Sequence, residues 1–427
     1  IDELAQKGSI ILPDQAEGYA LRLMDSPWNE GRRLLVLAGT DPRGVLYGVQ
    51  DFNSQILAIK AEPDRATPAL RREAFDSLED FTLSDYPKIP ERGIWTWGYV
   101  IYNYRRFFDN MARLKLNMVT MWNTVPPENI REVIDYAHSR GIRVVMGFNW
   151  GWGVEGVDIT KPADRKKIKQ SVLEEYGTRY AGLGIDAIYF QTQTEHFQTD
   201  SKGESTAAIA TKLVNDISGA LLEQNPHLEI HFGLHATSIQ DNYEPLAGLR
   251  DEVLIVWEDA GVIPFFYLPT TEFTTDHWRN FKIDVNNPEG TLRYAKELAE
   301  LRQGAPFAMV AKGWTNLDWN SFEDHGHYLM GEFSRDVVRE KLESRRARWD
   351  MINRVWLKNY PVAVEFYREM LETSPSGMLV QALIEDGMFS ESIEPAAALF
   401  GQMVWDPTRE ADSILEAALS PYYRLPR

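Results

Sequence analysis

The sequence predicts an α/β protein, a (β/α)8 TIM barrel with a small N-terminal α/β domain before it and a C-terminal helical region after it. Between residues 92 and 312, short apolar runs alternate with longer amphipathic stretches, which is typical of repeated βα units. After about residue 335, helical spacing of apolar residues replaces the runs of strand length. Right-handed crossovers of this length close most readily at eight strands, so we favour a barrel over the alternative, a doubly wound open sheet.

The first 85 residues indicate a small α/β domain and a linker. Two strands are expected at 19–24 and 34–38, and a helix at about 44–59. The turn-forming sequence Asp41-Pro42-Arg43-Gly44 separates the second strand from the helix. Prolines and mixed charge at 61–85 indicate the linker, and the first domain therefore ends at about residue 85.

The barrel is predicted over residues 86–334. Strands are expected at 92–97, 117–122, 142–149, 185–192, 229–235, 253–257 and 306–312. Helices are expected near 103–115, 128–140, 162–182, 204–224 and 288–303. We place the eighth strand at 328–333, a short run that glycine and charged residues flank.

Residues 335–427 form the predicted C-terminal helical region. Val338, Leu342, Trp349 and Ile352 recur at helical spacing there. We expect this region to complete the barrel, to cover its side, or to form the contact of a homodimer.

Composition excludes several classes of function. The net charge of −18 repels phosphate backbones, and no Lys/Arg cluster offsets it, so nucleic acid is not an expected partner. No apolar run approaches the ~18–20 residues that cross a bilayer, so no membrane interaction is expected. The absence of cysteine excludes disulfides, zinc–thiolate sites and cysteine nucleophiles. The chain opens on IDELAQKG without methionine, and from this we expect a removed leader or a longer protein, and a secreted or periplasmic location.

Aromatic and acidic residues follow the predicted strands. In a parallel barrel, the C-terminal strand ends face one another across a single mouth, where such proteins do chemistry. Indole faces and a few polar groups suit a sugar ring, so the expected partner is a glycan or oligosaccharide. The candidate binding residues are Trp95, Trp97, Trp122, Asn123, Asn149, Trp150, Trp152, Gln193, His196, His235, Trp257, Lys312 and Trp314. About half of the tryptophans are expected to pack between barrel and helices instead.

Glu195 is the candidate proton donor. The apolar run that begins at Ile185 ends abruptly in Gln-Thr-Gln-Thr-Glu-His, which delivers polar groups to the mouth. A carboxyl group beside indole rings has its pKa raised toward that of a general acid. The alternative is that Glu195 caps the next helix or pairs with a lysine.

A second carboxylate site, with Glu258 and Asp259 next to each other, follows the strand at 253–257. Glycosidic cleavage needs a partner for the acid, as a base for water or as a nucleophile. Adjacent residues of an extended chain point in opposite directions, so we expect only one of the two in the pocket. The alternative is an ion pair with Arg250 or Arg279.

His231 and His235 share one face of a predicted strand. We expect His235 to contact substrate or orient the acid, and His231 to be a core residue. A metal would need a His-x-His pair at the first strand, where this chain has Trp95-Thr96-Trp97. We therefore expect neither a metal nor a cofactor.

Three segments carry a family resemblance. They are Leu35-Val36-Leu37-Ala38-Gly39-Thr40-Asp41-Pro42-Arg43-Gly44-Val45-Leu46-Tyr47-Gly48-Val49, then Arg92-Gly93-Ile94-Trp95, then Leu116-Asn117-Met118-Val119. Over roughly residues 20–260 the chain resembles the glycoside hydrolase superfamily that holds the β-N-acetylhexosaminidases (family 20), the α-glucuronidases (family 67) and the O-GlcNAcase-like enzymes (family 84). The resemblance implies a catalytic barrel behind a small α/β domain.

One departure from the superfamily bears on mechanism. Its hexosaminidases place an Asp-Glu pair after the fourth strand, whereas Thr194 precedes Glu195 here. The α-glucuronidases use a lone Glu there, with carboxylates on later strands activating water, and this chain looks more like them. The resemblance therefore implies an exo-acting, inverting glycoside hydrolase with Glu195 as acid and Asp259 or Glu258 as base. The alternatives are an exo-sialidase or β-N-acetylhexosaminidase on the same scaffold, or a non-catalytic carbohydrate-binding protein.

Overall fold

The computed structural model describes residues 10–56, 75–123, 125–151, 156–191, 194, 200–258, 288–302, 304–314 and 326–421. Eight strands form a closed barrel in the order β10-β11-β12-β13-β4-β5-β6-β7, and every neighbouring pair is parallel. They are β4 (Glu91–Trp97), β5 (Met118–Trp122), β6 (Arg143–Gly147), β7 (Ala187–Gln191), β10 (Glu229–Leu234), β11 (Val253–Trp257), β12 (Phe307–Ala311) and β13 (Met378–Leu383). The predicted (β/α)8 barrel is confirmed, and so are the seven strands expected up to residue 312.

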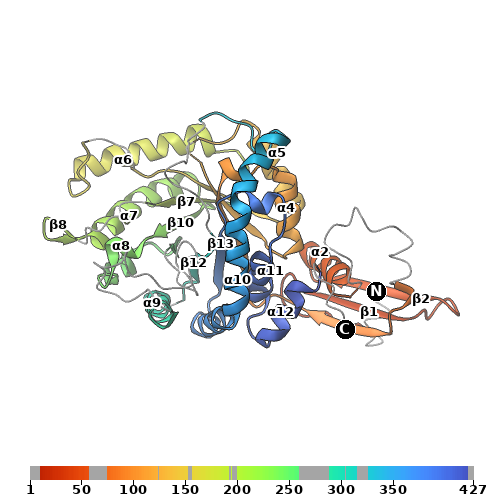
Figure 1. Cartoon of the computed structure of the whole chain (residues 1–427). Coiled ribbons are helices and arrows are strands. Elements are labelled where there is room, and N and C mark those ends of the chain that lie inside the picture. The colour runs from red at the N-terminus through yellow and green to blue at the C-terminus, as the bar shows by residue number, and fades with distance from the viewer. Residues whose placement is uncertain are drawn as a thin grey trace.

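Helices surround the barrel (Figure 1). They are α4 (Tyr104–Arg113), α5 (Ile130–Ser139), α6 (Pro162–Glu175), α7 (Thr206–Gln224), α8 (Ala236–Ile239), α9 (Pro288–Glu300), α10 (Arg335–Thr373), α11 (Pro395–Trp405) and α12 (Ala411–Leu419). The longest, α10, has 39 residues and begins at Ser334, whose hydroxyl accepts from the backbone N–H of Val337. None of the helices that the structure describes is long and apolar enough to cross a membrane.

The eighth strand is not where the sequence predicted it. Residues 328–333 form irregular chain with a turn at 330–331 rather than a strand, and they lead to the start of α10. The barrel closes instead through β13, which lies inside the region expected to be helical and pairs with β12 on one side and β4 on the other. The chain builds α10 before this strand, so closure of the barrel requires residues beyond 373.

Side-chain alternation divides the apolar residues of the barrel into two layers. One cluster fills the interior and includes Trp95, Met118, Val145, Tyr189, Val256, Val310 and Leu383. A much larger cluster lies between the strands and the surrounding helices. Successive residues of a strand point to opposite faces, so a shift of one position moves a side chain from one layer to the other.

The N-terminal unit is a three-stranded antiparallel sheet of order β2-β1-β3, with α2 (Pro42–Asp51) against it. Its strands are β1 (Tyr19–Asp25), β2 (Arg33–Gly39) and β3 (Phe81–Asp85). The third strand corrects the prediction of a linker up to residue 85. The Asp41 carboxylate accepts from the backbone N–H of Gly44 at 2.9 Å, which starts α2 as the turn sequence predicted.

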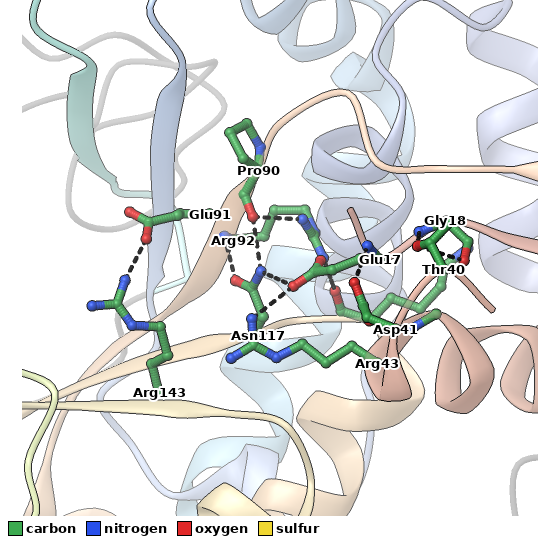
Figure 2. A network of polar contacts seen from close by, with 12 residues as sticks. Glu17, Gly18, Thr40, Asp41, Arg43, Pro90, Glu91, Arg92, Asn117 and Arg143 are labelled. Carbon is green, nitrogen blue, oxygen red and sulfur yellow. Dashed lines mark hydrogen bonds and ion pairs between the residues drawn. The ribbon is translucent and has the colours of Figure 1, made fainter. Parts of the chain in front are cut away.

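A buried ion pair joins this unit to the base of the barrel, at the N-terminal ends of its strands (Figure 2). The Arg92 guanidinium, which is fully buried at the start of β4, donates to Glu17 Oε2 at 2.6 Å. Asn117 and Arg43 donate to the other oxygen of the same carboxylate at 2.9 and 3.0 Å. Glu17 has a positive φ of 60°, a conformation that the surrounding contacts must hold. The two units are therefore tightly connected, away from the barrel mouth.

A second junction lies close by, where α11 meets the N-terminal sheet. Trp405 packs with Tyr19 and Tyr47, and its indole N–H donates to Asp85 at 2.8 Å. Lys115 Nζ lies 3.9 Å from the centre of the same indole and 2.9 Å from Asp51 Oδ2. The N-terminal unit and α11 thus share one hydrophobic cluster, and Lys115, just before β5, contacts it from the barrel side.

Candidate active site

Glu258 is the described carboxylate that enters the barrel mouth from β11. Its side chain is almost fully buried, and Gln191 at the end of β7 donates to its Oε1 at 2.7 Å. Lys312 Nζ, just after β12, lies 3.6 Å from its Oε2, and His235 Nε2, just after β10, lies 3.8 Å from the same atom. Hydrogen-bond donors and a cation therefore surround the Glu258 carboxyl group and hold it in place.

Gly233 on β10 makes this arrangement possible. A Cβ atom at this position would lie 2.1 Å from Tyr189 Oη and 2.8 Å from Glu258 Oε1. Both distances are far below a normal contact, so only glycine lets the phenol and the carboxyl approach here. Gly233 lies between His231 and His235 on the strand face that these two residues were predicted to share, and it is the position on that face where a side chain would clash.

Three tryptophans form an aromatic cluster inside the barrel, near its mouth. Trp95 and Trp97 come from β4 and Trp122 from β5, with ring centres 5.7 to 6.5 Å apart. Tyr189 closes the cluster, with its ring edge-on to Trp95 and Trp122 at 6.0 and 6.1 Å. Trp97 and Trp122 are only half-buried, so part of their surface remains available at the mouth.

Glu385 is a mouth residue that the sequence analysis missed. It lies two residues after β13, is 1% exposed, and accepts from the Trp97 indole N–H at 2.6 Å. The next residue, Asp386, is also buried and accepts from the Trp349 indole of α10 at 2.6 Å. A signal was present, because an apolar run followed by Glu-Asp occurs both at 253–259 and at 378–386. Because the eighth strand was predicted at 328–333, residues 378–383 were not recognised as a strand, and Glu385 was not recognised as a residue that follows one.

Asn123 and Asn149, the two asparagines predicted to bind substrate, lie in different surroundings. Asn123, fully buried after β5, accepts from the Tyr328 hydroxyl at 2.7 Å, so the segment before α10 reaches the mouth. A Cβ atom at Gly98 would lie 2.3 Å from Asn123 Oδ1, and glycine is therefore needed there too. Asn149 is exposed beyond β6.

Three other tryptophans that were predicted to bind substrate lie outside the barrel interior. Trp150 stacks on Phe190 with ring centres 3.6 Å apart, and Trp314 stacks on Trp356 of α10 at 4.2 Å. Trp257 packs edge-on against Tyr294 of α9 at 5.2 Å. All three are fully buried in the layer between strands and helices. The structure does not bring them together with Glu258, which accords with the expectation that about half of the tryptophans pack.

Five predicted residues lie outside the described part of the chain: Glu195, Asp259, Gln193, His196 and Trp152. Thr194, the residue before Glu195, is described and buried. Its hydroxyl accepts from the backbone N–H of His235 at 3.2 Å, and its carbonyl accepts from the Thr237 hydroxyl at 2.8 Å. The chain that follows β7 is therefore anchored to the chain that follows β10 at Thr194.

His231 lies lower in the barrel, away from the mouth. It is 2% exposed, and its Nε2 is 3.8 Å from Glu229 Oε2 at the start of β10. Among the described residues, no group of three or more His, Asp or Glu side chains is placed to hold a metal ion.

Comparisons with known proteins find similarity in structure alone. No family model matches the sequence, and no curated protein matches it either. Similar solved structures include CpGH84B, with 13% identity and a TM-score of 0.46 over 95% of this chain and 60% of that protein. A mutant O-GlcNAc hydrolase of Thermobaculum terrenum has 12% identity and a TM-score of 0.43, over 78% of this chain and 63% of that protein. A GH18 chitinase of Pseudoalteromonas aurantia has 10% identity and a TM-score of 0.38, over 72% of this chain and 99% of that protein. The chain thus spans about three fifths of the length of the first two.

Proposed function

We propose that this protein is an exo-acting glycoside hydrolase whose barrel mouth binds a terminal sugar. One observation carries the proposal: the buried, hydrogen-bonded carboxylate of Glu258 lies in the same barrel as the cluster of Trp95, Trp97 and Trp122. Indole faces stack on the C–H face of a pyranose, and a fixed carboxylate can act on its anomeric centre. Glu385 and Asn123 add oxygen acceptors for hydroxyl groups.

The proposed mechanism uses Glu195 as general acid and Glu258 as general base. Glu195 gives its proton to the glycosidic oxygen as the bond from that oxygen to the anomeric carbon breaks. A water molecule attacks the anomeric carbon and passes a proton to Glu258, so the sugar leaves with inverted configuration. The contacts with Gln191 and Lys312 support the base role, since they fix the position of the Glu258 carboxyl group in the barrel. The preference for Glu258 over Asp259 rests on this environment.

The substrate class within this proposal is the terminal uronic acid of an α-glucuronidase-type enzyme. Lys312 supports it, because a buried ammonium group at the mouth can face an anionic sugar as well as Glu258. N-acetylhexosamines and sialic acid are the competing substrates.

The test is a panel of chromogenic glycosides of glucuronic acid, N-acetylhexosamines, sialic acid and neutral hexoses, in both anomers. We expect wild type to release the chromophore from one of them, and Glu195→Gln and Glu258→Gln each to reduce kcat by roughly 10²–10⁴-fold. Lys296→Gln serves as a charge-changing control, since Lys296 pairs with Glu369 on the helical surface at 2.6 Å.

The stereochemical outcome is a separate measurement. Proton NMR of the first sugar released should show the anomer opposite to that of the substrate. A crystal structure should then place the Glu195 and Glu258 carboxyl groups about 6.5–9.5 Å apart, whereas about 5–5.5 Å would indicate retention through a nucleophile. Sugar binding without turnover of any glycoside or natural oligosaccharide would instead identify a carbohydrate-binding protein.

A further inference from the structure

The hydroxyl group of Tyr189 is a buried polar group without a hydrogen-bond partner in the described part of the chain. Tyr189 is 0% exposed on β7, and its ring packs edge-on against both Trp95 and Trp122. Packing therefore fixes the direction of the hydroxyl. A buried hydroxyl that bonds to nothing costs free energy, so such a group in a candidate site points to a partner that the protein itself does not supply.

The hydroxyl lies close to the Glu258 carboxyl group. A Cβ atom at Gly233 would meet both Tyr189 Oη, at 2.1 Å, and Glu258 Oε1, at 2.8 Å, so the two oxygens border the same small space above Gly233. They do not hydrogen-bond to each other. Gln191, two residues beyond Tyr189 on the same strand, already donates to Glu258 Oε1 at 2.7 Å. A phenolic donor beside a carboxylate acceptor matches a group that both accepts and donates one hydrogen bond.

We propose that Tyr189 and Glu258 together bind one O–H group, either of a water molecule or of a sugar hydroxyl. Tyr189 Oη donates to its oxygen, and Glu258 accepts its hydrogen. If the group is water, one lone pair of its oxygen remains to attack the anomeric carbon while the proton passes to Glu258. Tyr189 is then a residue that orients the nucleophile. The role of Tyr189 in catalysis rests on the proposed glycoside hydrolase function. The binding of the O–H group by Tyr189 and Glu258 does not depend on turnover.

Tyr189→Phe removes the hydroxyl and keeps the ring. Because the hydroxyl has no hydrogen-bond partner among the described residues, we expect the melting temperature of the free variant to be unchanged or higher. Crystal structures at high resolution should show an ordered water within about 3.2 Å of both Tyr189 Oη and the Glu258 carboxyl in wild type, and no water there in the variant. An empty space in wild type, or a direct bond from Tyr189 to a protein group, overturns the proposal. This result is independent of whether the protein hydrolyses any glycoside.

Kinetics with the glycoside found in the panel separates the two sources of the O–H group. Loss of roughly tenfold or more in kcat with unchanged KM indicates the attacking water, because the contact then matters only in the transition state. A similar rise in KM with unchanged kcat indicates a sugar hydroxyl, and the corresponding deoxy sugar should then bind wild type and variant equally. Unchanged kcat and KM overturn the proposal.

Tyr180→Phe is the matched control. Tyr180 is also fully buried with a hydroxyl that has no partner among the described residues, but it stacks on Phe148 in the layer outside the barrel, with ring centres 4.5 Å apart. We expect no change in kcat, KM or the water at Glu258. Equal kinetic effects of both variants would mean that loss of a buried phenol acts through general packing, and would overturn the role of Tyr189.

Discussion

At the scale of single residues, the candidate site depends on where side chains are absent. Gly233 admits the Tyr189 hydroxyl beside Glu258, and Gly147 lies so close to Trp122 that a Cβ atom would be 2.7 Å from its ring. A Cβ atom at Gly98 would likewise lie too close to Asn123, at 2.3 Å from its Oδ1. Large aromatic and polar groups can crowd into one barrel mouth because glycines on neighbouring strands leave them room.

Gly233→Ala should disrupt the site and the barrel together. The added methyl group has to displace either the Tyr189 hydroxyl or the Glu258 carboxyl, and overpacking of this kind typically costs about 1–3 kcal/mol. We expect a lower free energy of unfolding in urea and weaker sugar binding by calorimetry.

Gly219→Ala is the control for that substitution. Gly219 lies within α7, and the nearest atom to an added Cβ is a flexible Arg250 nitrogen at 3.6 Å. Alanine is the better helix former, so stability should rise by roughly 0.5–1 kcal/mol without any effect on binding. A stable, fully binding Gly233→Ala protein would contradict the geometry derived for the mouth.

At the scale of elements, ion pairs connect parts of the fold that are distant in sequence. Glu17 and Arg92 join the N-terminal unit to β4, as Figure 2 shows. At the base of the barrel, Arg143 of β6 bridges Glu91 of β4 and Glu229 of β10. Both networks lie away from the mouth, so their contribution is to stability.

Glu17→Gln should strongly destabilise the protein. The substitution keeps the size of the side chain but leaves the fully buried Arg92 guanidinium without its counter-charge, and removal of one partner of a buried pair costs about 3–5 kcal/mol. Chemical denaturation monitored by tryptophan fluorescence would measure the loss. Asp216→Asn, which breaks the more exposed pair with Lys169, should cost only about 0–1 kcal/mol. Equal costs for the two variants would contradict the role assigned to the buried pair.

Glu229 should make stability depend on pH in the acid range. The nearby His231 imidazole, with its Nε2 3.8 Å from Glu229 Oε2, and then the ion pair with Arg143, lower the pKa of Glu229 from 4.5 to about 2. Because the folded-state pKa is depressed, the stabilisation is fully present above the unfolded pKa near 4.5 and is lost as the pH falls toward 2. Wild type should therefore be more stable than Glu229→Gln at pH 7, and the difference should vanish near pH 2.

Urea denaturation of both proteins at several pH values between 2 and 7 would measure that difference. Its size should be modest, since the Glu229 side chain is 51% exposed and solvent screens its interactions. A difference that stays constant over this range would show that Glu229 does not titrate with the depressed pKa.

At the scale of the whole molecule, the barrel is complete only with the C-terminal part of the chain. β13 closes it between β12 and β4, Trp356 of α10 donates to the Gly313 carbonyl at 2.9 Å, and Trp405 of α11 packs into the N-terminal unit. In Figure 1, α10 runs along the barrel while α11 and α12 reach toward the N-terminal sheet. The first and last parts of the chain therefore depend on each other.

A fragment that ends at residue 334 should fail to fold. It lacks β13, so the edges of β12 and β4 would be exposed and prone to aggregation. We expect an insoluble product, or a soluble one without a cooperative thermal transition. Co-expression of the fragment 335–427 should restore solubility, which would show that closure of the barrel is the missing step. A cooperative fold of residues 1–334 alone would contradict this dependence.

The sequence by itself determined the barrel class, seven of its strands and the residues that follow them, because apolar runs, helical spacing and turn residues are local properties of the chain. It did not reveal β3, β13 or Glu385, since a short strand becomes recognisable only through the neighbours with which it pairs. Only the tertiary structure decided that Trp95, Trp97 and Trp122 lie inside the barrel while Trp150, Trp257 and Trp314 lie outside. Five of the six end or follow strands and Trp95 lies within β4, and which face of each strand points inward depends on how the barrel closes. The same closure selects Glu258 and brings Tyr189, Gly233 and Lys312 to it from three other strands.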